Sequence, residues 1–200
     1  VYYQVSKANY TTVTGSQTVV ISKAAGSLSY AATNISKTFG NAAFTNPLTL
    51  TGDGTVKYST SNASVAAVNA TTGEVTIAGS GSATITATVT DGTNYTYATK
   101  TASYTITVGT NVMNVTATGY TGTYDGQAHG ITVTAPDGAT VKYGTTAGSY
   151  TLTASPTYTA AGSYTVYYQV SKANYTTVTG SQTVVISKAA GSLSYATTRR

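Results

Sequence analysis

The sequence contains no cysteine, no tryptophan and a single methionine, and only 8% of its 200 residues are charged. The lack of cysteine excludes disulfides, cysteine-ligated zinc sites and thiol catalysis. The sequence has no run of about 18 apolar residues, so we predict no transmembrane helix in it. Leu-rich stretches with a 3.6-residue period are absent too, which argues against any long helix. The sequence therefore predicts a chain that is stabilised by a core of strands.

Clustered positive charge is also absent, although the formal net charge is +5. Residues 1–165 hold six lysines and five acidic residues. Most of the excess comes from four positions nearer the C-terminal end, which are Lys172, Lys188, Arg199 and Arg200. Without a basic patch, we expect no nucleic acid among the partners of the chain.

Tyrosine is abundant, with 18 residues against two phenylalanines, and 40% of the sequence is hydrophobic. Side chains alternate in Ser163–Ser171, where Tyr164, Val166, Tyr168 and Val170 share one face. A period of two residues is typical of a strand with one face in a core. The same period occurs at Ala83–Val89, Tyr104–Val108, Val56–Tyr58, Ile131–Val133, Val141–Tyr143, Tyr150–Leu152 and Val184–Ile186.

Glycine-containing turns separate these short strands at regular spacing, for example at Gly52–Gly54, Asp91–Gly92 and Asp137–Gly138. This pattern predicts an all-β chain of antiparallel β-sandwiches. The residues expected to matter most are core positions, because truncating or charging a buried side chain costs several kcal/mol. They are Ile85, Val133, Tyr164, Val166, Val184 and Ile186.

A long internal repeat sets the domain organisation. Residues 1–31 recur letter for letter as residues 166–196, a spacing of 165 residues. A period of this length indicates whole domains copied end to end, so we expect a window on a tandem array. The predicted parts are a C-terminal hairpin of a preceding repeat (1–23), two domains (24–109 and 110–188) and the start of the next repeat (189–200).

The N-terminal hairpin, predicted at Val1–Val5 and Val13–Ser22, has no strands of its own to pair with in this sequence. An isolated two-stranded hairpin is marginally stable in water. Its partners lie either upstream in a longer polypeptide, which we favour, or in another chain.

The first domain contains three motifs, at residues 58–68 (YSTSNASVAAV), 72–77 (TGEVTI) and 79–87 (GSGSATITA). Together they resemble the group 2 family of bacterial immunoglobulin-like domains, although Tyr58 stands where the family usually has tryptophan. The second domain resembles the Tyr-Asp-Gly type of repeat, through residues 124–129 (YDGQAH), 141–144 (VKYG) and 161–166 (AGSYTV). Such repeats occur in large surface adhesins of Gram-positive bacteria. The resemblance implies serial Ig-like sandwiches that form a secreted stalk, with wall anchoring outside this sequence.

Few residues suggest covalent chemistry. His129, the only histidine, lies close in sequence to Asp125 and Gln127, a combination that suggests a Thr–Gln ester cross-link, and Lys57 or Lys142 suggests a Lys–Asn cross-link. The simpler interpretation is a turn at Asp125 and an exposed strand end at His129. No serine-nucleophile motif is present, so we predict no catalytic residues and no enzyme activity.

Binding sites are equally sparse in the sequence. The four aspartates beside glycines form no D-x-D loop and are better interpreted as turn residues, so we predict no metal or cofactor. Alternation places Tyr2, Tyr95, Tyr97 and Tyr167 outward, where rings suit either stacking on sugars or ordinary cross-strand packing.

The leading functional hypothesis is a stalk or fibre segment of an extracellular bacterial adhesin, whose partners are neighbouring Ig-like repeats of the same or an identical chain. One alternative is a module that binds host glycans or host proteins through its tyrosines. Another is a self-assembling filament subunit joined by strand complementation.

Overall fold

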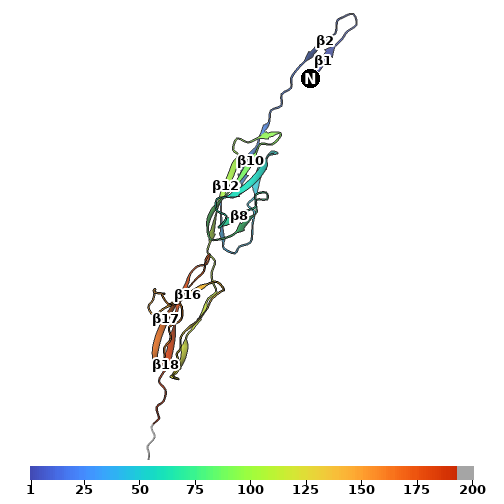
Figure 1. Ribbon diagram of the computed structural model, residues 1–200. Coiled ribbons are helices and arrows are strands. Elements are labelled where there is room, and N and C mark those ends of the chain that lie inside the picture. The colour runs from blue at the N-terminus through green and yellow to red at the C-terminus, as the bar shows by residue number, and fades with distance from the viewer. Residues whose placement is uncertain (193–200) are drawn as a thin grey trace, which may run out of the picture. The chain divides into compact units, whose positions relative to one another are not determined.

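The computed structural model describes residues 1–192, which contain strands, turns and loops but no helix (Figure 1). The described residues divide into two compact units, residues 1–37 with 42–107, and residues 38–41 with 108–192. No helix within the described residues is long and apolar enough to cross a membrane. The predicted start of a next repeat at residues 189–200 lies mostly outside the described residues.

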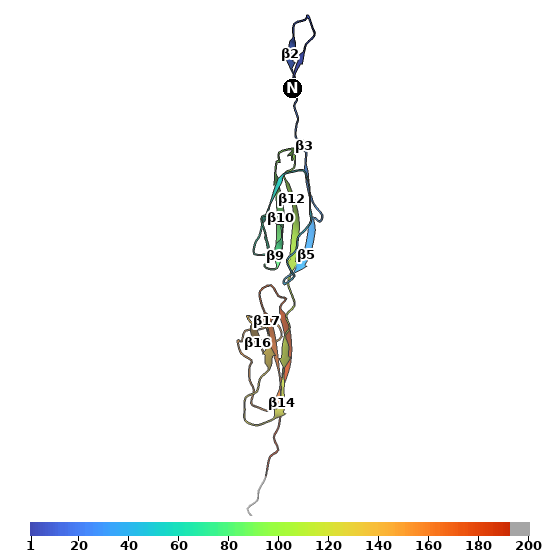
Figure 2. The ribbon, with the colours of Figure 1, turned by 90° about the vertical axis from the view of Figure 1, so that its right-hand side faces the viewer.

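The first unit contains a β-sandwich made of strands β3 to β12, here called the first sandwich (Figure 2). Its main sheet has the order β5-β12-β10-β7, and three further pairs are β3–β11, β4–β6 and β8–β9. The strands are β3 Ala24–Ala25, β4 Ser27–Tyr30, β5 Asn34–Thr38, β6 Leu48–Thr51, β7 Thr55–Thr60, β8 Ala66–Val68, β9 Val75–Ile77, β10 Gly81–Thr90, β11 Tyr95–Thr96 and β12 Thr101–Gly109.

The core of the first sandwich follows from alternation along its two longest strands. In β10 the buried face carries Ala83, Ile85, Ala87 and Val89. In β12 it carries Tyr104, Ile106 and Val108, and the residues between them are more exposed. Ala66 of β8 and Val75 of β9 are fully buried as well, so the main sheet is covered on this face.

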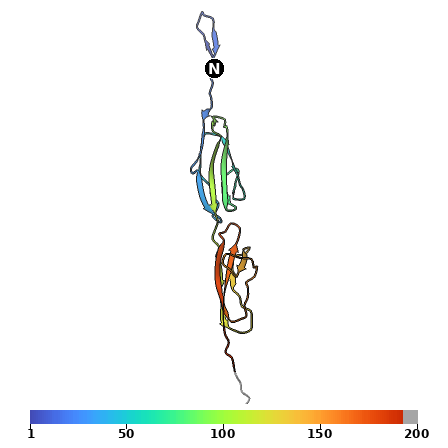
Figure 3. The same cartoon turned by 90° about the vertical axis from the view of Figure 1, so that its left-hand side faces the viewer.

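The second unit contains the second sandwich, made of strands β13 to β18 (Figure 3). Its main sheet has the order β14-β18-β17-β16, and β13 pairs with β15. The strands are β13 Thr116–Thr118, β14 Tyr120–Thr123, β15 Thr132–Thr134, β16 Thr140–Gly144, β17 Gly162–Ser171 and β18 Val178–Ser187. Leu152 forms only one bridge, to Tyr143, where alternation predicted a strand. A tight turn at Thr146–Ser149 leaves that segment too short for one.

The core of the second sandwich is centred on the long hairpin β17–β18. Val166 and Val184 are fully buried, and Ile131 and Ile186 lie beside them. Partly buried side chains that pack against these four are Tyr120, Val133, Tyr143, Tyr158, Tyr164 and Tyr168. Val133 and Tyr164 are thus half-buried, while Ile85, Val166, Val184 and Ile186 are almost fully enclosed.

Parallel strand pairs occur in both sandwiches. β11 pairs with β3 in parallel, and β14 pairs with β18 in parallel over four residue pairs, from Tyr120–Val184 to Thr123–Ser187. In each case a strand near the start of a sandwich lies beside one near its end. Alternation alone carries no information on strand direction, so the sequence did not distinguish these pairs.

The N-terminal hairpin consists of β1 (Tyr2–Val5) and β2 (Val13–Ser16), which pair with each other and with no other strand of the described chain. The prediction that its second strand continues to Ser22 is wrong, because β2 ends at Ser16. In the second copy of this sequence, β18 continues to Ser187 because β14 and the first residues of β17 lie on either side of it. No described strand lies beside residues 17–22.

Candidate functional site

The only histidine is held at the start of the second sandwich. His129 Nε2 lies 3.0 Å from Asp125 Oδ1 and 3.2 Å from Asp125 Oδ2, and its ring stacks on Tyr120 with centroids 3.7 Å apart. The backbone N–H of Gln127 donates to the same carboxylate at 2.9 Å. His129 is therefore not an exposed strand end, as the sequence suggested, since its side chain is only 17% exposed. Stacking on Tyr120 covers the ring.

The electrostatics of this cluster favour a structural role. The hydrogen bond with His129, helped by the N–H of Gln127, holds the pKa of Asp125 below its usual value. A carboxylate that accepts these bonds is stabilised as the anion, which makes it a poor proton donor. Lys57 and Lys142, the lysines considered for a cross-link, lie exposed on their strands. An amine that attacks an amide needs a desolvated environment to lose its proton.

Two other aspartates tie loops together in the first sandwich. Asp53 accepts hydrogen bonds from the backbone N–H groups of Asn94 and Tyr95, and the bond from Asn94 lowers its pKa. Asp91 accepts from Lys100 Nζ at 2.9 Å, and this bond lowers its pKa. Residues 1–192 contain no group of three or more histidine or acidic residues able to hold a metal ion. These carboxylates satisfy loop donors, in agreement with their interpretation as turn residues.

The four tyrosines predicted to face outward differ in exposure. Tyr2 is 90% exposed, and Tyr95 and Tyr167 are half-buried. The prediction for Tyr97 is wrong, because this side chain is buried. Its hydroxyl accepts a hydrogen bond from the backbone N–H of Gly54 at 3.0 Å.

Glycines make room for the buried Tyr97 ring. A Cβ at Gly26 would clash with the ring, and Gly52 combines a similar close approach with a φ of +119°. Only glycine adopts that conformation without strain. In the sequence, Gly26 and Gly52 were the available sign that a bulky side chain such as Tyr97 packs against the backbone there.

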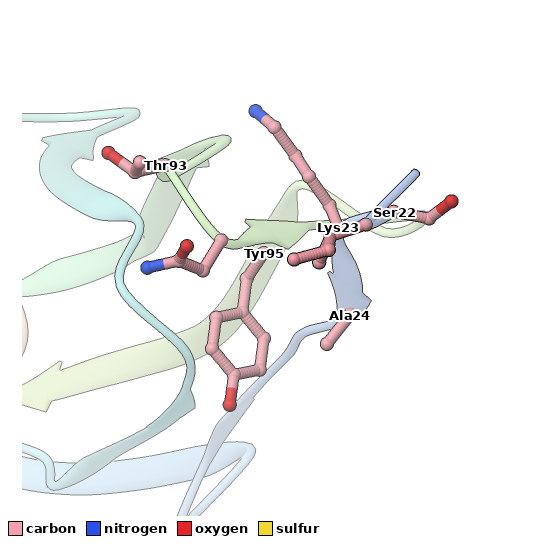
Figure 4. Close-up of a pocket in the computed structure, with 7 residues that line it drawn as sticks. Ser22, Lys23, Ala24, Thr93 and Tyr95 are labelled. Atoms are coloured by element: carbon pink, nitrogen blue, oxygen red, sulfur yellow. The ribbon is translucent and has the colours of Figure 1, made fainter. Parts of the chain in front are cut away.

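A shallow pocket of about 280 Å³ lies where residues 21–24 run alongside residues 93–95 (Figure 4). Lys23 Nζ donates to the carbonyl of Gly92 at 2.7 Å, and the N–H of Ala24 donates to the carbonyl of Asn94 at 2.8 Å. The side chains of Lys23 and Tyr95 extend in different directions in Figure 4, so they do not converge on one ligand position. The pocket offers one half-buried aromatic ring and few free polar groups.

The largest group of exposed apolar side chains belongs to the N-terminal segment, residues 1–22. Val1, Val5, Val19 and Ile21 are 77%, 62%, 66% and 91% exposed. Further exposed members are Tyr2, Tyr3, Tyr10, Val13 and Val20. The matching residues of the second copy, Val166, Val170, Val184 and Ile186, lie in the core of the second sandwich.

Comparison with known proteins gives one family match. Residues 48–93 match the family model of the immunoglobulin-like domain of intimin. This segment contains all three motifs that resemble bacterial Ig-like domains, so that broader resemblance is confirmed, while no finding addresses the Tyr-Asp-Gly repeat. No curated protein matches the chain.

Solved structures give only distant likenesses. Drosophila N-cadherin EC1-3 is 9% identical with a TM-score of 0.31, over 81% of this chain and 68% of that one. The protocadherin GammaB4 extracellular domain is 12% identical with a TM-score of 0.36, over 90% of this chain and 37% of that one. A SusE-like surface-located polysaccharide-binding protein from the heparin utilisation locus of Bacteroides thetaiotaomicron is 14% identical with a TM-score of 0.30, over 80% and 33%. With such scores these likenesses carry no functional argument. The predicted fold class, all-β with serial Ig-like sandwiches, is confirmed by the strands described above.

Proposed function

We propose that this chain is a stalk or fibre segment of a long extracellular bacterial surface protein, an adhesin in which repeated Ig-like domains space a binding head from the cell. The observation that carries this proposal is the position at which the chain enters and leaves each sandwich. A domain that the chain enters at one end and leaves at the other adds length when it is repeated.

In the first sandwich the chain enters beside the loop that precedes β12. The N–H of Ala24 bonds to Asn94, and the N–H of Gly26 bonds to Thr96. The chain leaves after β12, which begins at Thr101 and ends at Gly109. Nine residues of strand at 3.3 Å each separate the two ends by about 30 Å.

The second sandwich repeats this arrangement with different strands. Asn111 forms a parallel bridge to Tyr175, in the turn between β17 and β18, and its carbonyl accepts from the N–H of Thr176. The chain leaves at the far end of β18, ten residues from Val178 to Ser187. Both sandwiches are therefore suited to serial connection, and the exact repeat of residues 1–31 supports an array of such units.

The surroundings proposed for the array follow from its resemblances. Residues 48–93 are similar to an intimin Ig-like domain, a bacterial domain of adhesion type that is generally non-enzymatic. We place the second sandwich with Tyr-Asp-Gly type repeats on the strength of residues 124–129. The expected partners are neighbouring repeats, and the expected location is the cell surface.

Small-angle scattering of arrays tests the stalk. Chains with one, two and four copies of the 165-residue period are expected to increase in maximum dimension in proportion to copy number, by about 60 Å or more per period from the two strand lengths. An increase with the cube root of mass would mean a compact assembly and would contradict the proposal. Glycan and host-protein arrays with one period test the binding-module alternative, and a stalk segment is expected to give no signal.

A second candidate function is a filament subunit joined by strand complementation, in which strands of an identical chain complete the hairpin β1–β2. A hairpin whose apolar face is open adds readily to the sheet of another chain. This function and the stalk are compatible, since both place Ig-like sandwiches in series.

A further inference from the structure

Four Asp–Gly pairs occur in this chain, and each places its aspartate at an exposed position. They are Asp53–Gly54, Asp91–Gly92, Asp125–Gly126 and Asp137–Gly138. An aspartate before glycine is prone to react with its own main chain, because glycine has no Cβ to shield the next amide nitrogen. The reaction needs a carboxyl group that is free to turn and an amide nitrogen that is free to approach it. The four pairs differ in both respects.

Hydrogen bonds hold the carboxylate in three of the pairs. Each of these carboxylates accepts bonds from two other residues, which are Asn94 and Tyr95 for Asp53, Tyr97 and Lys100 for Asp91, and Gln127 and His129 for Asp125. In the first two pairs the next amide is bonded too, because the N–H of Gly54 donates to the Tyr97 hydroxyl and that of Gly92 donates to the Tyr95 carbonyl. A carboxylate that accepts such bonds is stabilised as the anion and fixed in direction. We therefore expect these three pairs to be protected.

The fourth pair lacks these restraints. Among residues 1–192, no group forms a hydrogen bond with the Asp137 carboxylate or with the N–H of Gly138. The pair forms the middle of a turn between β15 and β16, in which the N–H of Ala139 donates to the carbonyl of Pro136 at 3.1 Å and Gly138 has a φ of +72°. Apart from its chain neighbours, no described atom lies within 4 Å of the place that a Cβ would take at Gly138. The side chain and the amide nitrogen are therefore free to approach each other.

One side chain from a neighbouring strand contacts this turn. Lys172 Nζ donates to the main-chain carbonyl of Asp137 at 2.8 Å. The pairing of Thr140 with Ser171, where β16 begins and β17 ends, places Lys172 beside the turn. An ammonium group bonded to a carbonyl oxygen stabilises the negative charge that develops on that oxygen when a nucleophile adds to the carbon. The main-chain carbonyl of Asp137 is thus the one that Lys172 activates.

We propose that Asp137–Gly138 is a site of spontaneous isomerisation to isoaspartate, and that Lys172 is the positioning residue that directs the product. In the first step the Gly138 nitrogen bonds to Cγ of the protonated Asp137 carboxyl group, and the amide proton leaves with the carboxyl hydroxyl as water. In the second step water adds to the main-chain carbonyl carbon of Asp137, and the bond from this carbon to the Gly138 nitrogen breaks. No reagent other than water is needed, and the composition of the chain is unchanged. The inference does not depend on the stalk role.

The product changes the contact with Lys172. The main chain now passes through Cγ and is longer by one methylene group just before β16, while the former main-chain carbonyl carbon carries a carboxylate. This carboxylate forms at the atom that the Lys172 ammonium already contacts. A hydrogen bond between two charged groups is stronger than one to a neutral carbonyl. The same lysine therefore favours opening of the ring intermediate toward isoaspartate and stabilises the product.

The four pairs of the full chain serve as controls for one another. The chain is kept for weeks at neutral pH and body temperature, and isoaspartate is located in tryptic peptides by electron-transfer fragmentation. Peptide 101–142 contains both Asp125 and Asp137, so these two sites are compared in one molecule. Isoaspartate is expected to accumulate at Asp137 about tenfold faster than at the other three sites, or more, because hydrogen bonds to a charged group supply a factor of this size. In concentrated denaturant the four rates are expected to become similar.

Three outcomes would overturn the site. They are the absence of isoaspartate at Asp137, equal accumulation at all four pairs of the folded chain, and the same preference for Asp137 in denaturant. The last result would mean that the local sequence, and not the folded structure, selects the site.

A second measurement tests the role of Lys172. In an Asp137→Asn chain the same ring forms with loss of ammonia and opens to aspartate or isoaspartate, so both products are counted. Adding Lys172→Met, which keeps the apolar stem and removes the ammonium, is expected to lower the ratio of isoaspartate to aspartate by about twofold or more. Lys57→Met, at an exposed lysine of the first sandwich, is expected to leave the ratio unchanged. A ratio that Lys172→Met does not lower, or that Lys57→Met lowers equally, would overturn this role.

Discussion

The repeated sequence allows a mutation and its control to be made in identical sequence surroundings. Ile186 is 3% exposed in the core of the second sandwich, and its match Ile21 is 91% exposed. Changing isoleucine to alanine removes three methylene-sized groups, and each contributes about 0.8 kcal/mol when buried. With the cavity that remains, Ile186→Ala is expected to lower the free energy of unfolding of the second sandwich by about 3 kcal/mol. For Ile21→Ala the expected change is within about 0.5 kcal/mol.

The assay must avoid the repeated segment, because peptides from residues 1–31 and 166–196 have the same mass. Hydrogen exchange in dilute protein, followed in peptides from β14 and β16, reports on the second sandwich through sequences that occur once. Equal effects of the two substitutions would refute the reasoning, since they would mean that the two hairpins are equally buried in solution. No effect of Ile186→Ala would refute the assigned core.

Three further changes test the interior and the loops. Val166→Asp introduces a charge at a fully buried position and is expected to abolish cooperative unfolding of the second sandwich in calorimetry; a normal transition would show that the strand face is wrongly assigned. Tyr97→Phe removes the acceptor for the N–H of Gly54 and is expected to lower the free energy of unfolding of the first sandwich by about 1 kcal/mol, measured in denaturant. Tyr104→Phe removes a buried hydroxyl that has no partner among the described residues, so it is expected to leave this free energy unchanged or to raise it. The hydrogen bond with His129 lowers the pKa of Asp125 in the folded state, so the Asp125 carboxylate stabilises the fold above pH 3.8, and this stabilisation is lost as the pH falls through the lowered pKa. An Asp125→Asn chain is expected to lack this part of the dependence of unfolding free energy on pH. A pH profile identical to that of the unchanged chain would contradict this prediction.

The sequence was most informative where strands are long and one face is buried. Alternation predicted the inward residues of β10, β12 and β17, because a strand with one buried face has only one register that hides its apolar set. The same argument failed at Tyr97, which follows the two-residue strand β11. So short a strand fixes no face, and the ring turns into space left by glycines on other segments.

Contacts between segments distant in sequence could not be predicted from composition or spacing. His129 stacks on Tyr120, and no periodic pattern connects these two residues. The end of β2 at Ser16 has a similar cause, because whether residues 17–22 form a strand depends on neighbours and not on their own sequence. The identical residues 182–187 form a strand where neighbours are present. Tertiary context thus overrides local preference for strand structure.

The parallel pairing of β14 with β18 determines how the second sandwich responds to a pulling force. β14 lies near the start of this sandwich and β18 at its end, and they run side by side in the same direction. Tension applied through the two chain ends slides these strands past each other along their length. Their hydrogen bonds and the Tyr120–Val184 and Gly122–Ile186 neighbours are then loaded together in shear, and do not open one after another as in a hairpin that unzips. This geometry gives the second sandwich high resistance to extension along the chain.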